Sequence, residues 1–354
     1  MSTNLFELGL VPYFIQQLND PDLMTERLAR VMAVQRSKSS VMNGASELTV
    51  DLSPDLIQAS NEARPTVGDW VVLDASLTRI EQVLERKSLF KRLGAGSGTD
   101  LQPIAANIDV LFIVSSCNDE FKESRLERYL TLCIEAGATP VIVLSKADLV
   151  AEADADDFIE RARKVQADVA VEKVNALDPA TLDNVRAWIS NTTTVALVGS
   201  SGVGKSTLLN SLAGNTVVAT GAIREDDKKG RHTTTHRQLH VLPGGGLVID
   251  VPGMRELRVA DIADSIGTVF ADIERLASQC QFSDCHHESE PGCAVQQAII
   301  DEQIDARRLS SYNKLQREDA LATTTLAQKR AQGREFAKMV KTVKRFKQNR
   351  KPDY

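Results

Sequence analysis

The sequence has few cysteines and no long apolar run. Its five cysteines among 354 residues are odd in number, which argues against a scaffold held together by disulfides. No window approaches the roughly 18 apolar residues that a membrane-spanning helix needs, so we expect no membrane partner. The start, Met1–Glu7, lacks the basic residues and apolar core of a signal peptide. These absences predict a cytoplasmic protein.

The net charge of −6 is unusual for an RNA-binding protein, but the charge is unevenly distributed. From Lys329 to Tyr354 the chain has ten Lys and Arg against two acids, which is +8 and leaves −14 for the rest. The tail places apolar residues at helical spacing among the basic residues Lys338, Lys341, Lys344, Arg345, Lys347, Arg350 and Lys351. A basic tail on an acidic body indicates contacts with RNA phosphates; a solvated terminal helix is the alternative.

One segment matches a phosphate-binding loop, G-x-x-x-x-G-K-[ST], at every fixed position. It consists of Gly199, Ser200, Ser201, Gly202, Val203, Gly204, Lys205 and Ser206. The apolar stretch Thr194–Val198 predicts a buried strand before it, and Thr207–Leu212 predicts a helix after it. Backbone N–H groups and the helix N-terminus would bind phosphate. We expect Lys205 to contact the β- and γ-phosphates, Ser206 to ligate Mg²⁺, and Thr207 to complete the nucleotide-binding set.

Two segments downstream favour nucleotide hydrolysis. The stretch Leu247–Gly253 reads as an apolar strand that ends in Asp250, a candidate for the Mg²⁺ shell, with Gly253 as a γ-phosphate sensor. Between it and the phosphate loop lies Gly230–Thr235, in which Thr234 is a candidate Mg²⁺ ligand. The alternatives are an ordinary strand end with a Pro-Gly turn, and threonines that only begin a strand.

A candidate base-reading motif lies before the phosphate loop. Ser145, Lys146, Ala147 and Asp148 follow Pro140–Leu144, which reads as a buried strand. The Asp148 carboxylate can accept from guanine N1–H and N2–H₂, a donor pair that adenine lacks. The Lys146 stem can pack over the base. The residue usual at position 145 is Asn, and a serine hydroxyl makes fewer hydrogen bonds than an amide.

The chain also has a dense cluster of thiols and imidazoles. The spacing Cys280-x₄-Cys285-x-His287-x₅-Cys293 suits a closed tetrahedral Zn²⁺ site, and His286 is the competing imidazole. Buried thiols without a ligand are the alternative. Cys117 and Cys133, by contrast, are expected to be core or half-buried thiols.

The order of these motifs resembles the circularly permuted GTPases. It is most similar to the ribosome small-subunit-dependent GTPase A (RsgA/YjeQ) family, and the resemblance covers nearly the whole chain. Val67–Val72, Gly230–Thr235, Cys280–His287 and Glu290–Cys293 add to it. The resemblance favours His287 over His286 as the zinc ligand.

The family implies a GTPase with weak intrinsic activity that the small (30S) ribosomal subunit stimulates during late maturation. Its partners would be GTP or GDP and the 16S rRNA of that subunit, with the protein acting as a monomer. Many small GTPases orient the attacking water with a glutamine after the sensor glycine, but this chain has Met254 there. His232 is the candidate replacement that the family suggests, so we predict His232, Lys205 and Thr234 as catalytic residues. A structural or RNA-facing histidine is the alternative for His232.

The expected fold class is α/β, with a permuted P-loop GTPase domain between a β-barrel and a helical zinc domain. We expect an N-terminal arm at 1–25, an OB-fold barrel at 26–100, the GTPase domain at 103–255, and the zinc domain with its basic tail at 256–354. Gly94–Gly98 reads as the linker after the barrel, and Asn43-Gly44 as a hairpin turn. Strands are expected at Leu28–Gln35, Gly68–Asp74, Thr78–Leu84, Ile108–Ser115 and Asp168–Val174, and helices at Ser124–Ala136, Ala155–Gln166 and Pro179–Ser190.

Two other functions are compatible with these motifs. A GTP-gated RNA-binding assembly factor, in which hydrolysis is incidental, would carry the same residues. A P-loop ATPase of another class would share the phosphate loop, although Asp148 and the Pro-Gly after Asp250 favour GTP.

Overall fold

The structure is a computed structural model, and it describes residues 4–18, 27–35, 38–93, 101–214, 237–250, 262–323 and 328. Several predictions fall outside these residues: Gly230–Thr235 with His232 and Thr234, Gly253, Met254, the segment Gly94–Gly98 and the basic tail. Of Asp250, only the backbone is described.

The N-terminal part of the chain forms a closed five-stranded β-barrel. Its strands are β1 (Leu28–Val34), β2 (Ser39–Met42), β3 (Glu47–Leu52), β4 (Trp70–Leu73) and β5 (Arg79–Val83). They pair in the order β1-β2-β3-β5-β4, and β4 closes back onto β1. Alternate residues such as Val31, Val41 and Ile80 fill the interior. The expected strands and the Asn43-Gly44 hairpin are confirmed, and the pairing order is that of an OB-type barrel.

A short N-terminal arm packs on the barrel. It contains α1 (Pro12–Ile15), which begins with proline at the favoured first position. Leu8, Leu10 and Phe14 are buried, and the Phe14 ring lies 5.8 Å from that of Trp70. The arm therefore adds apolar cover to the barrel. Two short helices, α2 (Pro54–Gln58) and η2 (Asn61–Ala63), connect β3 to β4.

A hairpin lies where the sequence indicated a linker. Strand β6 (Leu89–Leu93) pairs antiparallel with β7 (Leu101–Ala106), and Leu93 lies opposite Leu101. The glycine-rich segment thus connects two strands of one hairpin. The interpretation of Gly94–Gly98 as a linker after the barrel was wrong, because the strands on either side of it pair directly.

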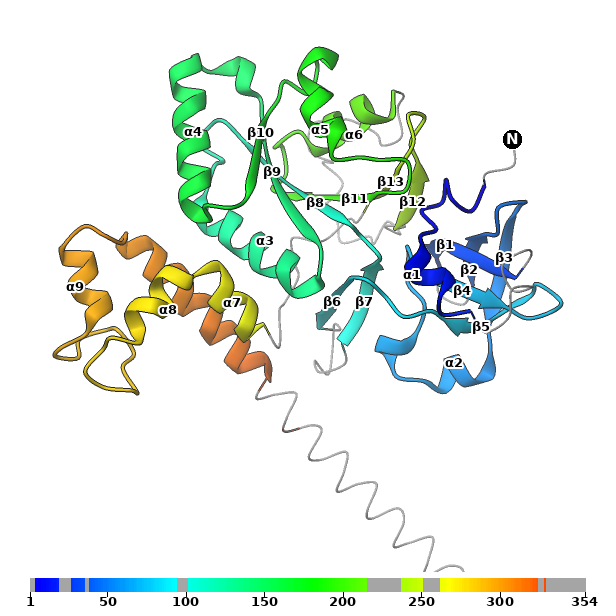
Figure 1. The fold of residues 1–354 in the computed structure, drawn as a ribbon, viewed down its shortest axis with the longest axis horizontal. Coiled ribbons are helices and arrows are strands. Elements are labelled where there is room, and N and C mark those ends of the chain that lie inside the picture. Colours follow the sequence, from blue (N-terminus) through cyan, green and yellow to red (C-terminus); the bar gives the residue numbers. More distant parts are fainter. Residues whose placement is uncertain are drawn as a thin grey trace, which may run out of the picture.

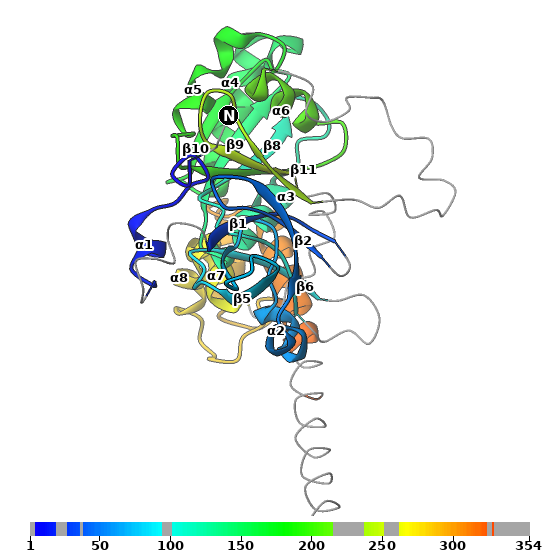
Figure 2. The ribbon, with the colours of Figure 1, turned by 90° about the vertical axis from the view of Figure 1, so that its right-hand side faces the viewer.

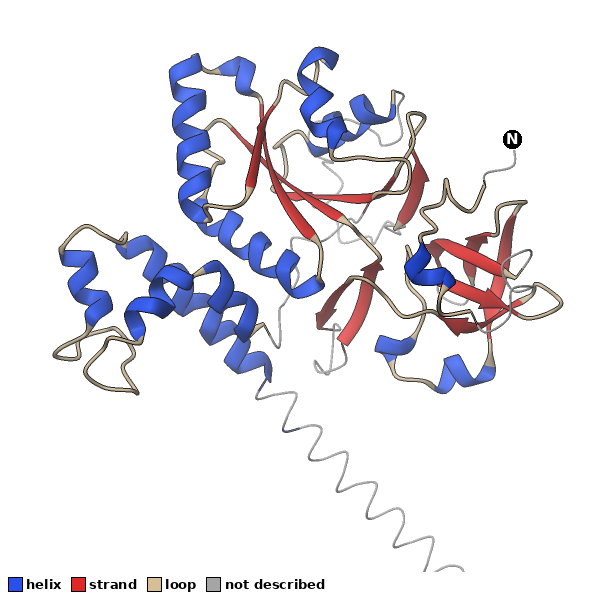
Figure 3. Ribbon diagram, viewed as in Figure 1, coloured by secondary structure: helices blue, strands red, loops and turns tan. Residues whose placement is uncertain are grey.

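A parallel sheet with helices on both faces follows. Its strands are β8 (Val110–Ser116), β9 (Thr139–Ser145), β10 (Ala170–Lys173), β11 (Thr194–Gly199), β12 (Gln238–Val241) and β13 (Leu247–Asp250). They lie in the order β10-β9-β8-β11-β13-β12, and only β12 is antiparallel to its neighbour (Figures 1 and 3). The helical elements are α3 (Glu123–Ala136), η3 (Ala147–Leu149), α4 (Glu152–Val165), η4 (Pro179–Leu182), α5 (Asp183–Ala187) and α6 (Lys205–Ala213).

The two faces of this sheet have separate cores. Leu126, Leu130 and Ala162 on α3 and α4 pack on one face, and Val185 and Leu208 on α5 and α6 pack on the other. Cys117 and Cys133 are both fully buried, as expected. Burial raises the pKa of the Cys117 thiol to about 11.

The barrel and the parallel sheet are joined through hydrogen bonds. Strand β1 pairs with β12, with Ala33 opposite Gln238. The fully buried Arg30 on β1 donates to the carbonyls of Leu8, Gly68 and Asn107 and to the Thr194 hydroxyl. One arginine therefore connects the arm, the barrel and the first residue of β11.

The C-terminal region is helical. It contains α7 (Ala263–Val269), α8 (Ala271–Ala277), α9 (Ala294–Ile300) and a helix over residues 306–323. In Figure 1 this region lies at lower left and the barrel at lower right, and Figure 2 shows the α/β unit above both. Helix α3 contacts the region directly, since Ser265 donates to Glu135. Among the described residues, we find no helix that is long and apolar enough to cross a membrane.

Candidate active site and metal centre

The phosphate loop connects β11 to α6 as predicted. Gly199 has φ +147°, and a Cβ there would come within 2.1 Å of the Val114 carbonyl oxygen on β8. Gly204, with φ +94°, caps the N-terminus of α6. Both positions require glycine, because a side chain would clash at the first and strain the backbone at the second.

Lys205 folds back over this loop. Its Nζ donates to the carbonyl oxygens of Gly199 at 2.9 Å and Ser200 at 2.5 Å. Ser206 and Thr207 lie half-buried in the first turn of α6. This arrangement places an ammonium group and a helix N-terminus at the same point, which suits a polyphosphate.

Asp250 ends the strand next to the phosphate-loop strand. Ala196 on β11 lies opposite Ile249 on β13, and the two strands are parallel. The carboxyl ends of parallel strands share one sheet edge, so Asp250 lies at the edge from which Gly199 begins the loop.

The expected base-reading loop ends β9 at this same edge. Lys146 adopts a left-handed conformation, φ +59°, which starts the short helix η3 and leaves Asp148 exposed. The Ser145 side chain is fully buried, and its hydroxyl lies 2.5 Å from the Val203 carbonyl and 3.0 Å from the Ser115 carbonyl. Ser145 therefore connects the base-reading loop to the phosphate loop.

The loop after β10 also approaches α6. Ser211 on α6 donates to the Ala176 carbonyl at 2.6 Å, and Thr181 donates to the Asn175 carbonyl at 2.8 Å. Asn175 and Ala176 thus lie beside the phosphate-loop helix.

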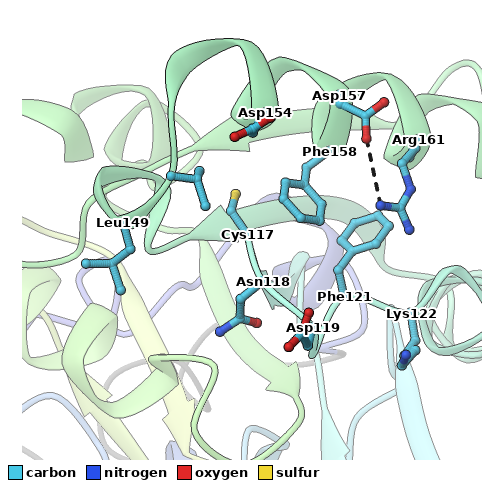
Figure 4. Close-up of a pocket in the computed structure, with 11 residues that line it drawn as sticks. Cys117, Asn118, Asp119, Phe121, Lys122, Leu149, Asp154, Asp157, Phe158 and Arg161 are labelled. Carbon is cyan, nitrogen blue, oxygen red and sulfur yellow. Dashed lines mark ion pairs between the residues drawn. The ribbon is translucent and has the colours of Figure 1, made fainter.

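A pocket of 750 Å³ opens beside the base-reading loop (Figure 4). Phe121 and Phe158 form its aromatic side, with ring centroids 5.2 Å apart. The Arg161 guanidinium lies over both rings and binds Glu123 at 2.7 Å. These contacts fix the loop between β8 and α3 against α4.

The cysteine–histidine cluster is assembled in the helical region. The Nδ1 atom of His287 lies 3.4 Å from the Sγ atoms of Cys285 and Cys293 and 3.6 Å from that of Cys280. The Sγ atoms of Cys280 and Cys293 are 3.9 Å apart. Tetrahedral zinc with ordinary bond lengths needs about 3.6 Å between sulfur and nitrogen and about 3.8 Å between sulfurs. The four residues can therefore hold a metal ion through His287 Nδ1.

The surroundings act differently on the residues of the cluster, since burial raises the pKa of the Cys285 thiol to about 11. Burial raises the pKa of the Cys280 thiol, but N–H groups of Ala294 and Val295 outweigh this and hold the pKa below its ordinary value. Cys293 caps α9 and accepts from the Gln296 N–H at 3.4 Å. Burial lowers the pKa of His287, which keeps the imidazole neutral.

Two polar contacts around the phosphate loop are not indicated by the sequence motifs. Arg125 on α3 donates to the Ser200 hydroxyl at 2.6 Å, and Ser145 reaches Val203. Each pair is more than fifty residues apart in the chain, so no local spacing indicates them.

The phosphate loop follows, along the chain, the loop predicted to read the base, yet both lie at one sheet edge, and this order is that of a circularly permuted P-loop GTPase. The comparisons agree with this class. The model of the RsgA GTPase family matches residues 83–260. A model for ABC transporters matches residues 182–350, which include the phosphate loop that both classes share.

Relatives extend the match to the whole chain. A small ribosomal subunit biogenesis GTPase RsgA 2 of Vibrio parahaemolyticus is 45% identical over 100% of this chain and 96% of its own. The RsgA of Mesorhizobium japonicum is 44% identical over 90% of each. The crystal structure of YjeQ from Thermotoga maritima has a TM-score of 0.59 at 24% identity, over 82% of this chain and 96% of that one. YloQ, described as a circularly permuted GTPase, has a TM-score of 0.57 at 22% identity, over 85% of this chain and 97% of that one. The chain belongs to the RsgA GTPase family.

Proposed function

We propose that this GTPase acts in biogenesis of the small ribosomal subunit, as the names of its relatives indicate for them. The observation that carries the proposal is the joined site: Ser145 ties the base-reading loop to the loop that carries Lys205. Such a site can couple the identity of the base to the position of the phosphates. The protein works in the cytoplasm as a monomer and binds the 30S subunit through its 16S rRNA.

Hydrolysis is assigned to Lys205 in the phosphate loop and to residues of the motifs downstream of it. Lys205 stabilises charge on the β- and γ-phosphates, and Ser206, Thr234 and Asp250 would hold the Mg²⁺ that accompanies GTP in this family. A Mg²⁺ ion held there would supply positive charge to the phosphates. Gly253 senses the γ-phosphate through its N–H. His232 orients the attacking water, because Met254 lacks a polar group for this purpose.

The Cys₃His cluster is proposed to bind zinc with a structural role. The sulfur–nitrogen distances match tetrahedral zinc, and all four ligand positions are occupied by protein atoms. Zinc there would hold the chain between α8 and α9. The basic tail, Lys329 to Tyr354, supplies phosphate contacts to rRNA.

The decisive experiment measures GTP turnover by the purified protein with and without small ribosomal subunits. We expect a low basal rate, strong stimulation by 30S subunits, and competition by GDP but not by ATP. No stimulation would remove the ribosomal function, and competition by ATP would favour an ATPase. The His232→Ala variant should hydrolyse GTP slowly while still binding the subunit. If cells that carry this slowly hydrolysing variant still assemble small ribosomal subunits normally, GTP hydrolysis is incidental to the assembly function.

A further inference from the structure

Ser200 of the phosphate loop is held from two sides by positive groups. Its carbonyl accepts from Lys205 Nζ at 2.5 Å, and its hydroxyl accepts from Arg125 Nη1 at 2.6 Å. Arg125 Nη1 also donates to the backbone carbonyl oxygen of Glu120 at 3.2 Å and to the Glu120 carboxylate at 3.0 Å. The guanidinium therefore links the loop before α3 to the phosphate loop.

The start of α3 is a fixed platform for Arg125. Leu126 is buried, and Glu123 is bound by Arg161, which lies over Phe121. Movement of Ser200 relative to this platform would break a short hydrogen bond from a charged donor. Such bonds are stronger than neutral ones.

The next residues of α3 bind the helical region. The fully buried Glu127 pairs with Arg307 at 3.1 Å and with Arg308 at 3.2 Å. Arg308 continues to Asp272 at 2.7 Å, and Arg128 on α3 binds Glu318 at 2.6 Å. One turn of α3 thus contacts the phosphate loop, and the same and following residues contact the helix over residues 306–323, which binds α8 through Arg308 and Asp272.

We propose that Arg125 is a positioning residue for GTP hydrolysis, and that α3 transmits the docked position of the helical region to the phosphate loop. Arg125 fixes Ser200, and Ser200 in turn fixes the backbone that Lys205 spans. The transmission step rests on the proposed ribosomal function, whereas the positioning step requires only that the protein is a GTPase.

The positioning step is tested by a double-mutant cycle of Arg125→Gln and Ser200→Ala in the full-length protein without ribosomes. Loss of one charged hydrogen bond predicts that basal kcat falls about tenfold in each single variant and no further in the double variant. GDP affinity should change by less than about threefold, because the bond mainly orders the loop for the transition state. Arg125→Lys should restore part of the rate, since it returns one positive donor.

Arg163→Gln is the matched control, since Arg163 lies exposed on α4 and pairs at the surface with Glu160. Its kcat should equal that of the wild type. An unchanged kcat in Arg125→Gln, or losses from Arg125→Gln and Ser200→Ala that simply multiply, would overturn the positioning role.

The transmission step is tested by the ratio of GTP turnover with and without 30S subunits. We expect this ratio to fall severalfold in Arg125→Gln and to be unchanged in Arg163→Gln. An unchanged ratio in Arg125→Gln overturns transmission through α3. Absence of stimulation in the wild type would instead reject the ribosomal function and, with it, the transmission step, while the cycle without ribosomes would still decide the role of Arg125.

Discussion

The hydroxyl of Ser145 lies 2.5 Å from the carbonyl oxygen of Val203, so the base-reading and phosphate loops are joined by a single buried side chain. The hydroxyl has one proton for two carbonyl acceptors, Val203 and Ser115. Gly204 lies close to this hydroxyl, since a Cβ at Gly204 would sit 3.6 Å from Ser145 Oγ. The Ser145 side chain therefore holds the two loops together inside the protein.

Replacement of Ser145 by alanine should weaken nucleotide binding without changing the preferred base. The change removes the hydroxyl that contacts both buried carbonyls, which costs about 1–3 kcal/mol, and it loosens the phosphate loop. Affinities for GDP and inosine diphosphate should fall by the same factor in titrations with fluorescent analogues. A selective loss for one base would show instead that Ser145 contacts the base.

Replacement of Asp148 by asparagine should change the preferred base. A carboxylate accepts from the two guanine donors, whereas an amide offers one donor and one acceptor, which matches xanthine. We expect GDP affinity to fall about 100-fold or more and xanthosine diphosphate to bind better than in the wild type. Equal binding of GDP by the variant and the wild type would remove Asp148 from the base site.

Ser145 and Asp148 show which features of the site can be predicted from the sequence. The motif placed both residues at the end of a strand, and β9 ends there. The role of Ser145 depends on Val203, which is distant in the chain and becomes a neighbour only because β9 and β11 flank β8. Similarly, Gly94–Gly98 has the composition of a linker, and only the pairing of Leu93 with Leu101 identifies a hairpin. Local patterns specified the strands and helices, whereas contacts between distant segments required the fold.

Removal of the proposed zinc should unfold part of the helical region. Cys280, Cys285, His287 and Cys293, which could hold a metal ion, lie together between α8 and the start of α9. A Cys285→Ala variant should lose bound zinc by elemental analysis and melt earlier, because metal binding contributes directly to folding. Cys117→Ala, which removes a buried thiol directly after β8, should retain the zinc. Full zinc content in Cys285→Ala would exclude Cys285 as a ligand.

Replacement of Arg30 by methionine should destabilise the junction of barrel and GTPase domain. It removes the donor from four acceptors, including Thr194 at 2.9 Å and Leu8 at 2.5 Å. We expect a loss of about 3–5 kcal/mol in the free energy of unfolding, as for breaking a buried charged network. Arg27→Met is the control, because Arg27 is partly exposed and pairs with exposed Glu81. The free energy of unfolding of Arg27→Met should fall by no more than about 1 kcal/mol. Similar losses in both variants would show that Arg30 contributes no more than a surface pair.

Acid should weaken the turn between β4 and β5. The Ser76 hydroxyl and the N–H groups of Thr78 and Arg79 donate to Asp74 and lower its pKa from 3.8 to about 2. Since the folded state favours the charged carboxylate, the stabilisation is complete above the unfolded pKa and is lost as pH falls through the folded pKa. In urea unfolding, the wild type should lose more stability between pH 5 and pH 3 than an Asp74→Asn variant, which cannot titrate at this position. Parallel pH profiles of the two proteins would show that Asp74 has the same pKa in the folded and unfolded chains.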